Sequence, residues 1–468
     1  MRTDPPAGRR ERNVEVQLLS RKADVVVGGY EALVRPVLFR RYGGDPEKIH
    51  EAMIHLLGRV ADTRFASLLP LLVGRPHDPV TVAGVRFPGR VGVAAGLDKD
   101  AMAAKIWARL GFGFAELGTV TAQAQPGNPK PRVFRLPGSR AIINRMGFNN
   151  NGAEALAARL ESWRVRRGEN TLGIPVGISI GKTKIVNVDS AVEDYCQSLA
   201  ALRRYADYIA VNVSSPNTPD LRTLQGKAQI YDLVKALVDQ ARSLGESPLP
   251  HPSLSLNSSL SSNSSLSSCP PLSSCQRQDL LTQPPSSAPD PAPLPIFVKL
   301  APDLDDAGLN DLVEAAIAAG ASGLIATNTT LSRDGIRGKD MRYARQSGGL
   351  SGAPLTLRAR KIVARVVRSG LPVIASGGIM TAADAQAMLD LGAKAVQVYT
   401  GFIYSGPGLV SQINTSCRTA PVISTPAPVI LSSPSVRMPS PSVILPQAGS
   451  PSVAPTTSTP ATQHMEES

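Results

Sequence analysis

The sequence predicts an α/β fold, a (β/α)8 barrel of the TIM type, with a small N-terminal helical cap and two disordered Ser/Pro-rich tracts. From about residue 80, apolar runs of strand length alternate with amphipathic helical patterns. Polar clusters follow nearly every apolar run, as expected where parallel strands end at a ligand site. The number of strand–helix units matches a closed barrel, and a doubly wound sheet is the alternative.

The first part of the chain has no strand pattern. Residues 1–29 are polar and are expected to form a loose extension. Residues 30–74 contain three short amphipathic patterns, at 30–42, 47–60 and 64–73. Such helices either pack on the main domain or form an apolar vestibule that can touch a membrane, and the sequence leaves both open.

The barrel is expected to span residues 75–417. The predicted strands are 91–95, 114–117, 174–180, 207–213, 296–300, 323–327, 373–376 and 395–399. Helical patterns between them include 100–110, 153–166, 304–319 and 382–391.

Two tracts interrupt this pattern, at residues 246–294 and 418–468. Both are rich in Ser and Pro and have neither helical nor strand periodicity, so both are predicted to be disordered. The first tract precedes a strand, and helix-to-strand loops lie on the barrel face opposite the active site. Because loop-closure entropy grows only logarithmically with length, such an insertion is compatible with the fold.

Composition limits the class of protein. The net charge of +13 favours anionic ligands, anionic lipid or nucleic acid without choosing among them. The four cysteines lack zinc-ligand spacing and predict a reducing compartment, and no metal site is expected. No apolar run reaches the ~18 residues of a membrane-spanning helix. The Arg-rich start also contains acidic residues, which fits a mitochondrial transit peptide poorly.

The most informative polar cluster is Asn212-Val213-Ser214-Ser215-Pro216-Asn217-Thr218, which directly follows a predicted strand. Its amides and hydroxyls can hold a planar, hydrogen-bonding ligand and move a proton. The glycines after the last two strands, in Ser376-Gly377-Gly378 and Thr400-Gly401, suit phosphate binding through backbone N–H groups. Together they predict a phosphate-bearing ring cofactor and a small anionic substrate.

As an ordered set, these motifs resemble the dihydroorotate dehydrogenase family, in particular its membrane-associated, quinone-using class. The matching segments are 94–99, 126–136, 144–150, 212–218 with Leu221-Arg222, 299–303, 327–330, 348–352 and Tyr399. The match covers about residues 30–245 and 295–415.

The resemblance implies specific site residues. FMN would be held by Ala95, Gly96, Lys99, Thr119, Ser179, Asn212, Lys299, Thr327, Gly352, Gly378, Tyr399 and Thr400. Dihydroorotate would contact Lys99, Asn144, Arg145, Met146, Gly147, Phe148, Asn212, Asn217, Asn328 and Thr329. Ser215 would be the catalytic base, with Thr218 in its proton relay, and Ser214 is expected to be structural.

The resemblance also gives the N-terminal helices a role, as an apolar tunnel that admits quinone. His50, Arg135 and Tyr399 match tunnel positions. The expected partners are dihydroorotate, orotate, a membrane quinone and a membrane surface, without nucleic acid. The expected location is the cytoplasmic face of a bacterial inner membrane, and the mitochondrial inner membrane is the alternative.

Two of the departures from the family pattern predict a weaker cofactor site and a weaker barrel. Ser179 stands where the family has an asparagine that contacts the flavin, which predicts weaker cofactor retention. The last helix runs into the Ser/Pro tail near Cys417, which predicts weaker barrel closure. The alternatives are therefore another FMN barrel oxidoreductase, such as an RNA-base reductase, and a degraded, non-catalytic homologue.

Overall fold

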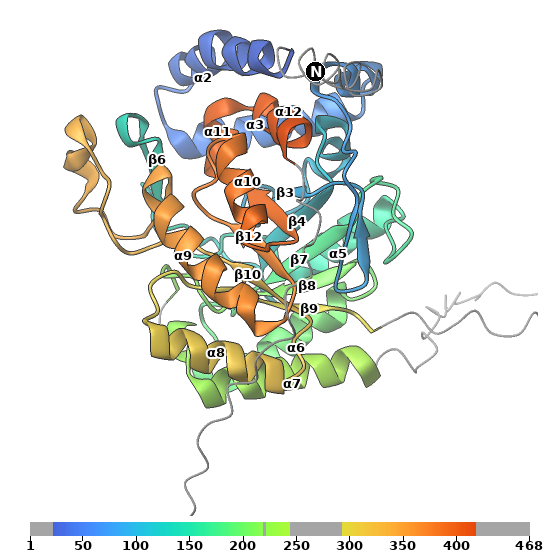
Figure 1. Ribbon diagram of the computed structural model, residues 1–468. Helices are drawn as coiled ribbons and strands as arrows, with labels where there is room; N and C mark the ends of the chain where they lie inside the picture. The colour runs from blue at the N-terminus through green and yellow to red at the C-terminus, as the bar shows by residue number, and fades with distance from the viewer. Residues whose placement is uncertain (1–21, 219–220, 244–292, 418–468) are drawn as a thin grey trace, which may run out of the picture. The chain divides into compact units, whose positions relative to one another are not determined.

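The computed structural model describes residues 22–218, 221–243 and 293–417 (Figure 1). Of the two tracts predicted to be disordered, 418–468 and all of 246–294 except residues 293–294 lie outside these residues, as does the predicted loose segment 1–21. Leu294 is buried, so the prediction of disorder is wrong at that end of the tract. Residues 22–29 are helical, so the prediction of a loose extension is wrong there. This helix packs on the last helix of the described chain, Pro407–Ser416, where Gln412 Nε2 donates to Asp24 Oδ1 at 2.7 Å.

The centre of the fold is a closed barrel of parallel strands, which confirms the predicted fold class and excludes the doubly wound sheet. Its strands are β3 (Val91–Val93), β4 (Phe114–Val120), β7 (Val176–Ile180), β8 (Tyr208–Val211), β9 (Ile296–Leu300), β10 (Gly323–Ala326), β12 (Val373–Ser376) and β13 (Ala395–Val398). Each lies within or overlaps a predicted strand. At the seam, Val396 and Val398 of β13 are in register with Val91 and Val93 of β3, so the barrel closes there.

Large aromatic side chains fill the amino-terminal end of the barrel. Phe87 stacks on Phe114 with ring centroids 4.3 Å apart, and Tyr208 packs against Phe297 at 5.2 Å. Gly177 leaves room for these rings, since a Cβ there would lie 2.0 Å from the Tyr208 ring. An antiparallel hairpin of β1 (Val80–Val82) and β2 (Val85–Phe87), which the sequence did not predict, covers this end. Any ligand cavity must therefore open at the opposite end.

Helices surround the barrel (Figure 1). They are α5 (Ala153–Ser162), α6 (Ala191–Leu202), α7 (Lys227–Ser243), α8 (Asp306–Ala318), α9 (Thr356–Val366), α10 (Ala382–Asp390), α11 (Thr400–Ser405) and α12 (Pro407–Ser416). Short 3-10 turns occupy Pro137–Ser139, Val188–Ser190, Leu221–Gln225, Gly338–Tyr343, Ala353–Leu355 and Val367–Ser369.

The predicted helix over 100–110 is wrong. The chain instead forms two 3-10 turns, Ala104–Ile106 and Ala108–Leu110. The buried Asp98 carboxylate accepts hydrogen bonds from Ala103 N at 3.1 Å and Trp107 Nε1 at 3.0 Å. These bonds bind the chain into a compact loop in place of regular helical hydrogen bonding.

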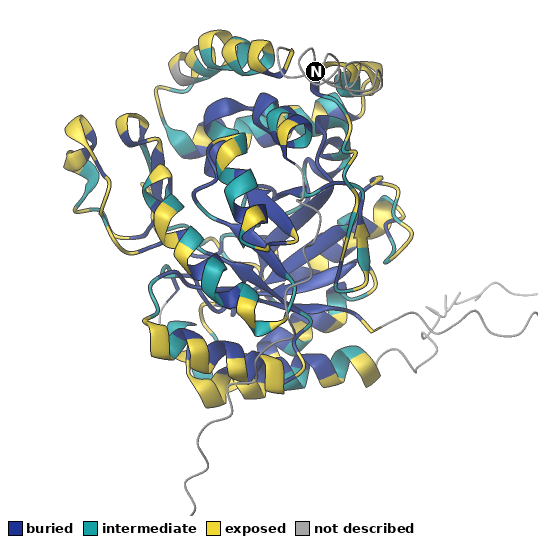
Figure 2. Cartoon of the chain, viewed as in Figure 1, coloured by how far each residue is buried: buried dark blue, intermediate teal, exposed yellow. Residues whose placement is uncertain are grey.

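The cap consists of a π-turn (Tyr30–Val34), α2 (Arg35–Arg41), α3 (Pro46–Ala61), a 3-10 turn (Arg64–Leu68) and α4 (Leu69–Val73). Asp45 caps α3 by accepting from Glu47 N and Lys48 N. Many apolar cap side chains remain exposed, with Leu33 at 70% and Leu71 at 75%, and Figure 2 shows the exposed face of α2. Within the described ranges, no helix combines the length and apolarity needed to cross a bilayer.

A second, antiparallel sheet stands at the carboxyl end of the barrel and was not predicted. It is made of β5 (Val133–Leu136), β6 (Ala141–Asn144) and β11 (Gly349–Gly352), in the order β11-β6-β5. The sheet brings Asn144 and Gly352 to the mouth of the barrel.

Candidate active site

A cavity opens at the carboxyl ends of the barrel strands and collects most of the predicted site residues. Of the predicted cofactor and substrate residues it is lined by Ala95, Gly96, Lys99, Thr119, Asn144, Met146, Gly147, Phe148, Asn212, Asn217, Lys299, Thr327, Asn328, Thr329, Gly352, Gly378, Tyr399 and Thr400, and also by the predicted base Ser215. Three predicted residues, Arg145, Ser179 and Thr218, do not line it. Arg145 turns its guanidinium over the Phe134 ring and donates to Gln346 Oε1 at 2.9 Å.

Ser179 acts behind the cavity wall rather than in it. Its buried hydroxyl lies 2.9 Å from Thr119 Oγ1, which also accepts from Asn212 Nδ2 at 3.0 Å. Ser179 therefore does not line the cavity itself but orients two residues that do, Thr119 and Asn212.

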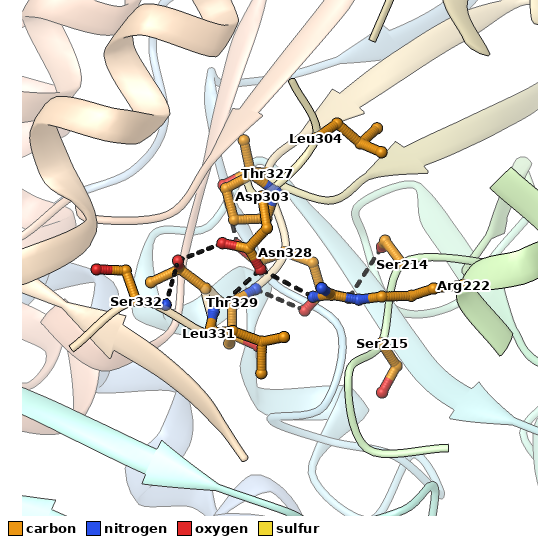
Figure 3. A network of polar contacts seen from close by, with 12 residues as sticks. Ser214, Ser215, Arg222, Asp303, Leu304, Thr327, Asn328, Thr329, Leu331 and Ser332 are labelled. Carbon is orange, nitrogen blue, oxygen red and sulfur yellow. Dashed lines mark hydrogen bonds and ion pairs between the residues drawn. The ribbon is translucent and has the colours of Figure 1, made fainter. Parts of the chain in front are cut away.

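The loop after β8 separates the roles of its two serines. Ser214 Oγ accepts from Asn328 Nδ2 at 3.0 Å and is buried (Figure 3). Ser215 Oγ lines the cavity, and the hydrogen bond it accepts, from Asn217 N, is 3.3 Å long. Thr218 Oγ1 is buried and has no hydrogen-bond partner within the described ranges. Ser215 is therefore available to a ligand, whereas Ser214 holds the loop.

Asp303 ties this loop to the one after β10 (Figure 3). Its carboxylate lies 3.0 Å from Arg222 Nη2 on one side. On the other side it accepts from Thr330 Oγ1 at 2.5 Å and Leu331 N at 3.0 Å. One carboxylate therefore fixes the distance between the loop of Ser215 and the loop of Asn328 and Thr329.

Two lysines place positive charge in the cavity. Lys99 donates to Asn149 Oδ1, and burial, followed by the charge of Arg132, lowers the pKa of its ammonium to about 8. Lys299 Nζ lies 3.1 Å from Glu116 Oε1 in a buried ion pair. Glu116 also accepts from Gln397 Nε2 at 2.6 Å and from Tyr208 Oη at 3.2 Å. Sequence reasoning missed Glu116, since only its neighbours in space show that it supports two cavity residues.

The cavity also has features that suit a phosphate-bearing ring. Gly377 and Gly378 have φ values of 98° and 71°, and a Cβ on Gly378 would lie 2.4 Å from Thr356 Cα. Only glycine lets the backbone turn this closely against Thr356, which leaves the backbone at 377–378 open to the cavity. Two buried acceptors in the cavity lining, Gln397 Oε1 and Asn217 Oδ1, have no hydrogen-bond partner within the described ranges. Both could accept a ring N–H or a hydroxyl group.

A second, mainly apolar cavity lies between the cap and the barrel. The predicted tunnel residues His50, Arg135 and Tyr399 all line it, beside Phe402 and Tyr30. Tyr30 Oη donates to Ile403 O at 3.0 Å, which joins the cap to α11. Burial, followed by the charge of Lys99, lowers the pKa of His50 to about 4, so its imidazole is neutral at neutral pH.

The two cavities adjoin. Asn144, Met146 and Tyr399 line both of them. Tyr399 lies in the wall between them, and burial raises the pKa of its hydroxyl to about 12, so the group stays protonated. The α3 helix both packs on the barrel domain and lines the apolar cavity, through Glu47, His50 and Ile54 among others.

The fold and the paired cavities define a TIM-type barrel protein with a polar cavity at the strand ends and an adjoining apolar cavity under the cap. The dihydroorotate dehydrogenase family model matches residues 79–419. The chain is 46% identical over 395 residues to dihydroorotate dehydrogenase (quinone) of Salinispora arenicola, covering 83% of this chain and 99% of that protein. It is 42% identical over 396 residues to the protein of the same name from Chloroflexus aurantiacus, covering 83% and 96%.

A solved structure agrees. The crystal structure of DHODH from Eimeria tenella in complex with ferulenol aligns with a TM-score of 0.62 at 33% identity, covering 79% of this chain and 90% of that one. This chain belongs to the dihydroorotate dehydrogenase family.

Proposed function

We propose that the protein oxidises dihydroorotate to orotate, uses FMN as its cofactor, and passes the electrons to a membrane quinone in pyrimidine synthesis. The observation that carries the proposal is the pair of adjoining cavities, one polar and one apolar, with Tyr399 in both walls. A polar substrate and an apolar electron acceptor can then reach the same cofactor from different sides. The printed names of the relatives from Salinispora and Chloroflexus, dihydroorotate dehydrogenase (quinone), support both substrates.

FMN fits the polar cavity. The residues that would hold it are Ala95, Gly96, Lys99, Thr119, Asn212, Lys299, Thr327, Gly352, Gly378, Tyr399 and Thr400. The glycine turn at 377–378 suits the phosphate, and the unpartnered Gln397 Oε1 suits a ring donor. Bound FMN would supply the acceptor for two electrons. Ser179 supports this site through Thr119.

Dihydroorotate fits the side of the cavity rich in amides. The Lys99 ammonium pairs with the substrate carboxylate, and Asn144, Asn217 and Asn328 meet the ring amides. The remaining contacts would come from Met146, Gly147, Phe148, Asn212 and Thr329. Ser215 takes the proton from C5, and because a serine hydroxyl is a weak base, the buried Thr218 hydroxyl serves as its relay. Arg145 supports the site from outside, because its carbonyl oxygen accepts from the Asn128 amide, which also donates to Asn217 O.

Quinone fits the apolar cavity. His50, Arg135 and Tyr399 supply its few polar groups, and neutral His50 suits an uncharged ligand. The exposed leucines of the cap would rest on the membrane surface, where a basic protein is attracted to anionic lipid. We place the protein on the cytoplasmic face of a bacterial inner membrane, with the mitochondrial inner membrane as the alternative.

The experiment that tests this function is dihydroorotate-dependent reduction of a soluble quinone by the purified full chain. Reduction of the quinone with stoichiometric orotate formation is the expected result, and NAD⁺ in place of quinone is the control acceptor. Orotate formation with NAD⁺ but not with quinone would contradict the assignment of the apolar cavity. The alternative function, an RNA-base reductase, predicts RNA binding that weakens as the salt concentration rises. No observation favours it, because the chain belongs to the dihydroorotate dehydrogenase family.

A further inference from the structure

A buried ion pair joins the cap to the barrel. Glu47 on α3 and Arg132 are each 5% exposed, and Arg132 Nη2 and Nε lie 2.8 and 3.1 Å from Glu47 Oε1. Lys130 Nζ adds a second cation at 3.2 Å. Burial opposes ionisation of Glu47, but hydrogen bonds from Arg132 and Lys130 outweigh it and lower the pKa of the carboxyl. Glu47 is therefore an anion held between two cations.

Arg132 also fixes the loop that leads into β5. Its Nη1 donates to Pro126 O at 2.6 Å and to Asn128 O at 2.7 Å. The Asn128 amide then donates to Arg145 O and to Asn217 O, both at 3.0 Å. Asn217 lines the polar cavity, and so do the two neighbours of Arg145. A guanidinium that Glu47 orients thus determines where two walls of the substrate site lie.

The same pair sets the charge around Lys99, which also lines the polar cavity. The charged groups that act on Lys99 are Arg132, which disfavours its ammonium form, and Asp100, Glu47 and Glu51, which favour it. Its hydrogen bond goes to the neutral Asn149 amide. Loss of the Glu47 carboxylate would leave the Arg132 charge less neutralised and would make the Lys99 ammonium easier to deprotonate.

We propose that Glu47, which lines the quinone cavity, is a positioning residue for the dihydroorotate site, acting through Arg132 on the loop of Asn128 and on Lys99. The cap then contributes to both half-reactions rather than to quinone access alone. The inference rests on the proposed function.

The test is the reaction with dihydroorotate in the absence of both oxygen and quinone, followed by bleaching of the flavin absorbance in wild type and in Glu47→Gln. The variant is expected to bind dihydroorotate about tenfold more weakly, because Arg132 loses the charged partner that holds it against the loop of Asn128. The rate at saturating substrate should change much less. The pH above which affinity falls, near 8 in the wild type, should move lower in the variant.

Glu51→Gln is the matched control. It removes the same charge from the same helix, but Glu51 is half-exposed and contacts Lys130 at 3.6 Å rather than Arg132. Because the hydrogen bonds of Arg132 stay intact, it should bind dihydroorotate as the wild type does below pH 8, and it should move the pH dependence less than Glu47→Gln does, since Glu51 ranks below Glu47 among the charges that act on Lys99. Flavin content and thermal unfolding of each variant show whether the fold is retained.

Arg132→Lys is the second variant, because a lysine keeps the charge but cannot hold two carbonyls and a carboxylate together. It should also weaken dihydroorotate binding, and it carries the test if Glu47→Gln does not fold. Wild-type affinity and pH dependence in a folded Glu47→Gln or Arg132→Lys protein would overturn the proposal. Failure of dihydroorotate to bleach the wild type would instead overturn the proposed function.

Discussion

Replacing Glu116 by glutamine should destabilise the barrel and raise the reduction potential of the bound flavin. The substitution keeps the shape of the side chain but removes the carboxylate 3.1 Å from Lys299 Nζ. Both side chains are nearly inaccessible to solvent, at 6% and 0% exposed, and breaking a buried ion pair on one side costs about 3–5 kcal/mol. The free energy of unfolding should fall by about that amount. Because Lys299 lines the cofactor cavity, its unneutralised charge should also stabilise electrons added to the flavin.

The assay combines urea unfolding with a dye-equilibrated measurement of the flavin midpoint potential. Tyr208→Phe is the control, since it removes a neutral donor 3.2 Å from the same carboxylate and keeps the buried ring. It should cost about 1 kcal/mol and leave the potential unchanged. An unfolding free energy and a potential like those of the wild type in Glu116→Gln would refute the view that Glu116 neutralises Lys299.

Three further predictions concern the substrate side and the cap. Ser215→Ala should retain flavin but lose nearly all turnover, by about 10²–10⁴-fold as for loss of a general base, whereas Ser214→Ala should lose far less. The rate of flavin reduction by dihydroorotate, measured by stopped flow, distinguishes the two variants, and equal rates would contradict the assignment of Ser215 as the base. The affinity for dihydroorotate should be highest at pH values below about 8 and fall as the pH rises through the pKa of Lys99, because the substrate carboxylate pairs with the ammonium form of Lys99. An affinity that does not change from pH 6 to about 9 would show that Lys99 does not bind the substrate carboxylate. Replacing the exposed Leu68 and Leu71 by serine should lower the fraction of protein that sediments with anionic vesicles, without changing reduction of the flavin by dihydroorotate. Unchanged vesicle binding would place the membrane contact elsewhere.

The strands of the barrel were predictable because each is a short, fully buried and mostly apolar run bounded by turn residues. The cavity was predictable for the same reason, since residues that follow parallel strands meet at one end of a barrel whatever their distance in sequence. The predicted residues Ala95, Asn212 and Thr327 come from three strand ends and line one cavity.

The buried ion pairs and the antiparallel sheet could not be predicted, because they depend on contacts between segments far apart in the sequence. Glu116 and Lys299, and Glu47 and Arg132, are paired across long stretches of chain, and a charged residue in a single sequence does not indicate its partner. The sheet of β5, β6 and β11 escaped prediction because β11 is a short, glycine-rich segment, Gly349–Gly352, that joins strands far earlier in the chain. The prediction of a helix over 100–110 is wrong because one buried carboxylate, Asp98, binds the Ala103 N–H and the Trp107 side chain and so holds the segment in a compact loop.

The structure also changes what removal of the cap is expected to do. If the N-terminal helices only admit quinone, as the resemblance implies, deletion of residues 1–74 would spare the reaction with dihydroorotate. The Glu47–Arg132 pair links α3 to the loop of Asn128, so deletion should weaken that reaction as well. Substitutions within the apolar cavity, such as His50→Ala, are therefore the cleaner way to separate the two half-reactions.

The central claim is that one flavin site accepts electrons from dihydroorotate. The most direct test is an absorbance spectrum of the purified full chain, recorded without oxygen before and after addition of dihydroorotate. The account predicts flavin bands that bleach on addition of the substrate and return when quinone is added. A yellow protein that dihydroorotate does not bleach, or a colourless protein that cannot be reconstituted with FMN, would contradict it.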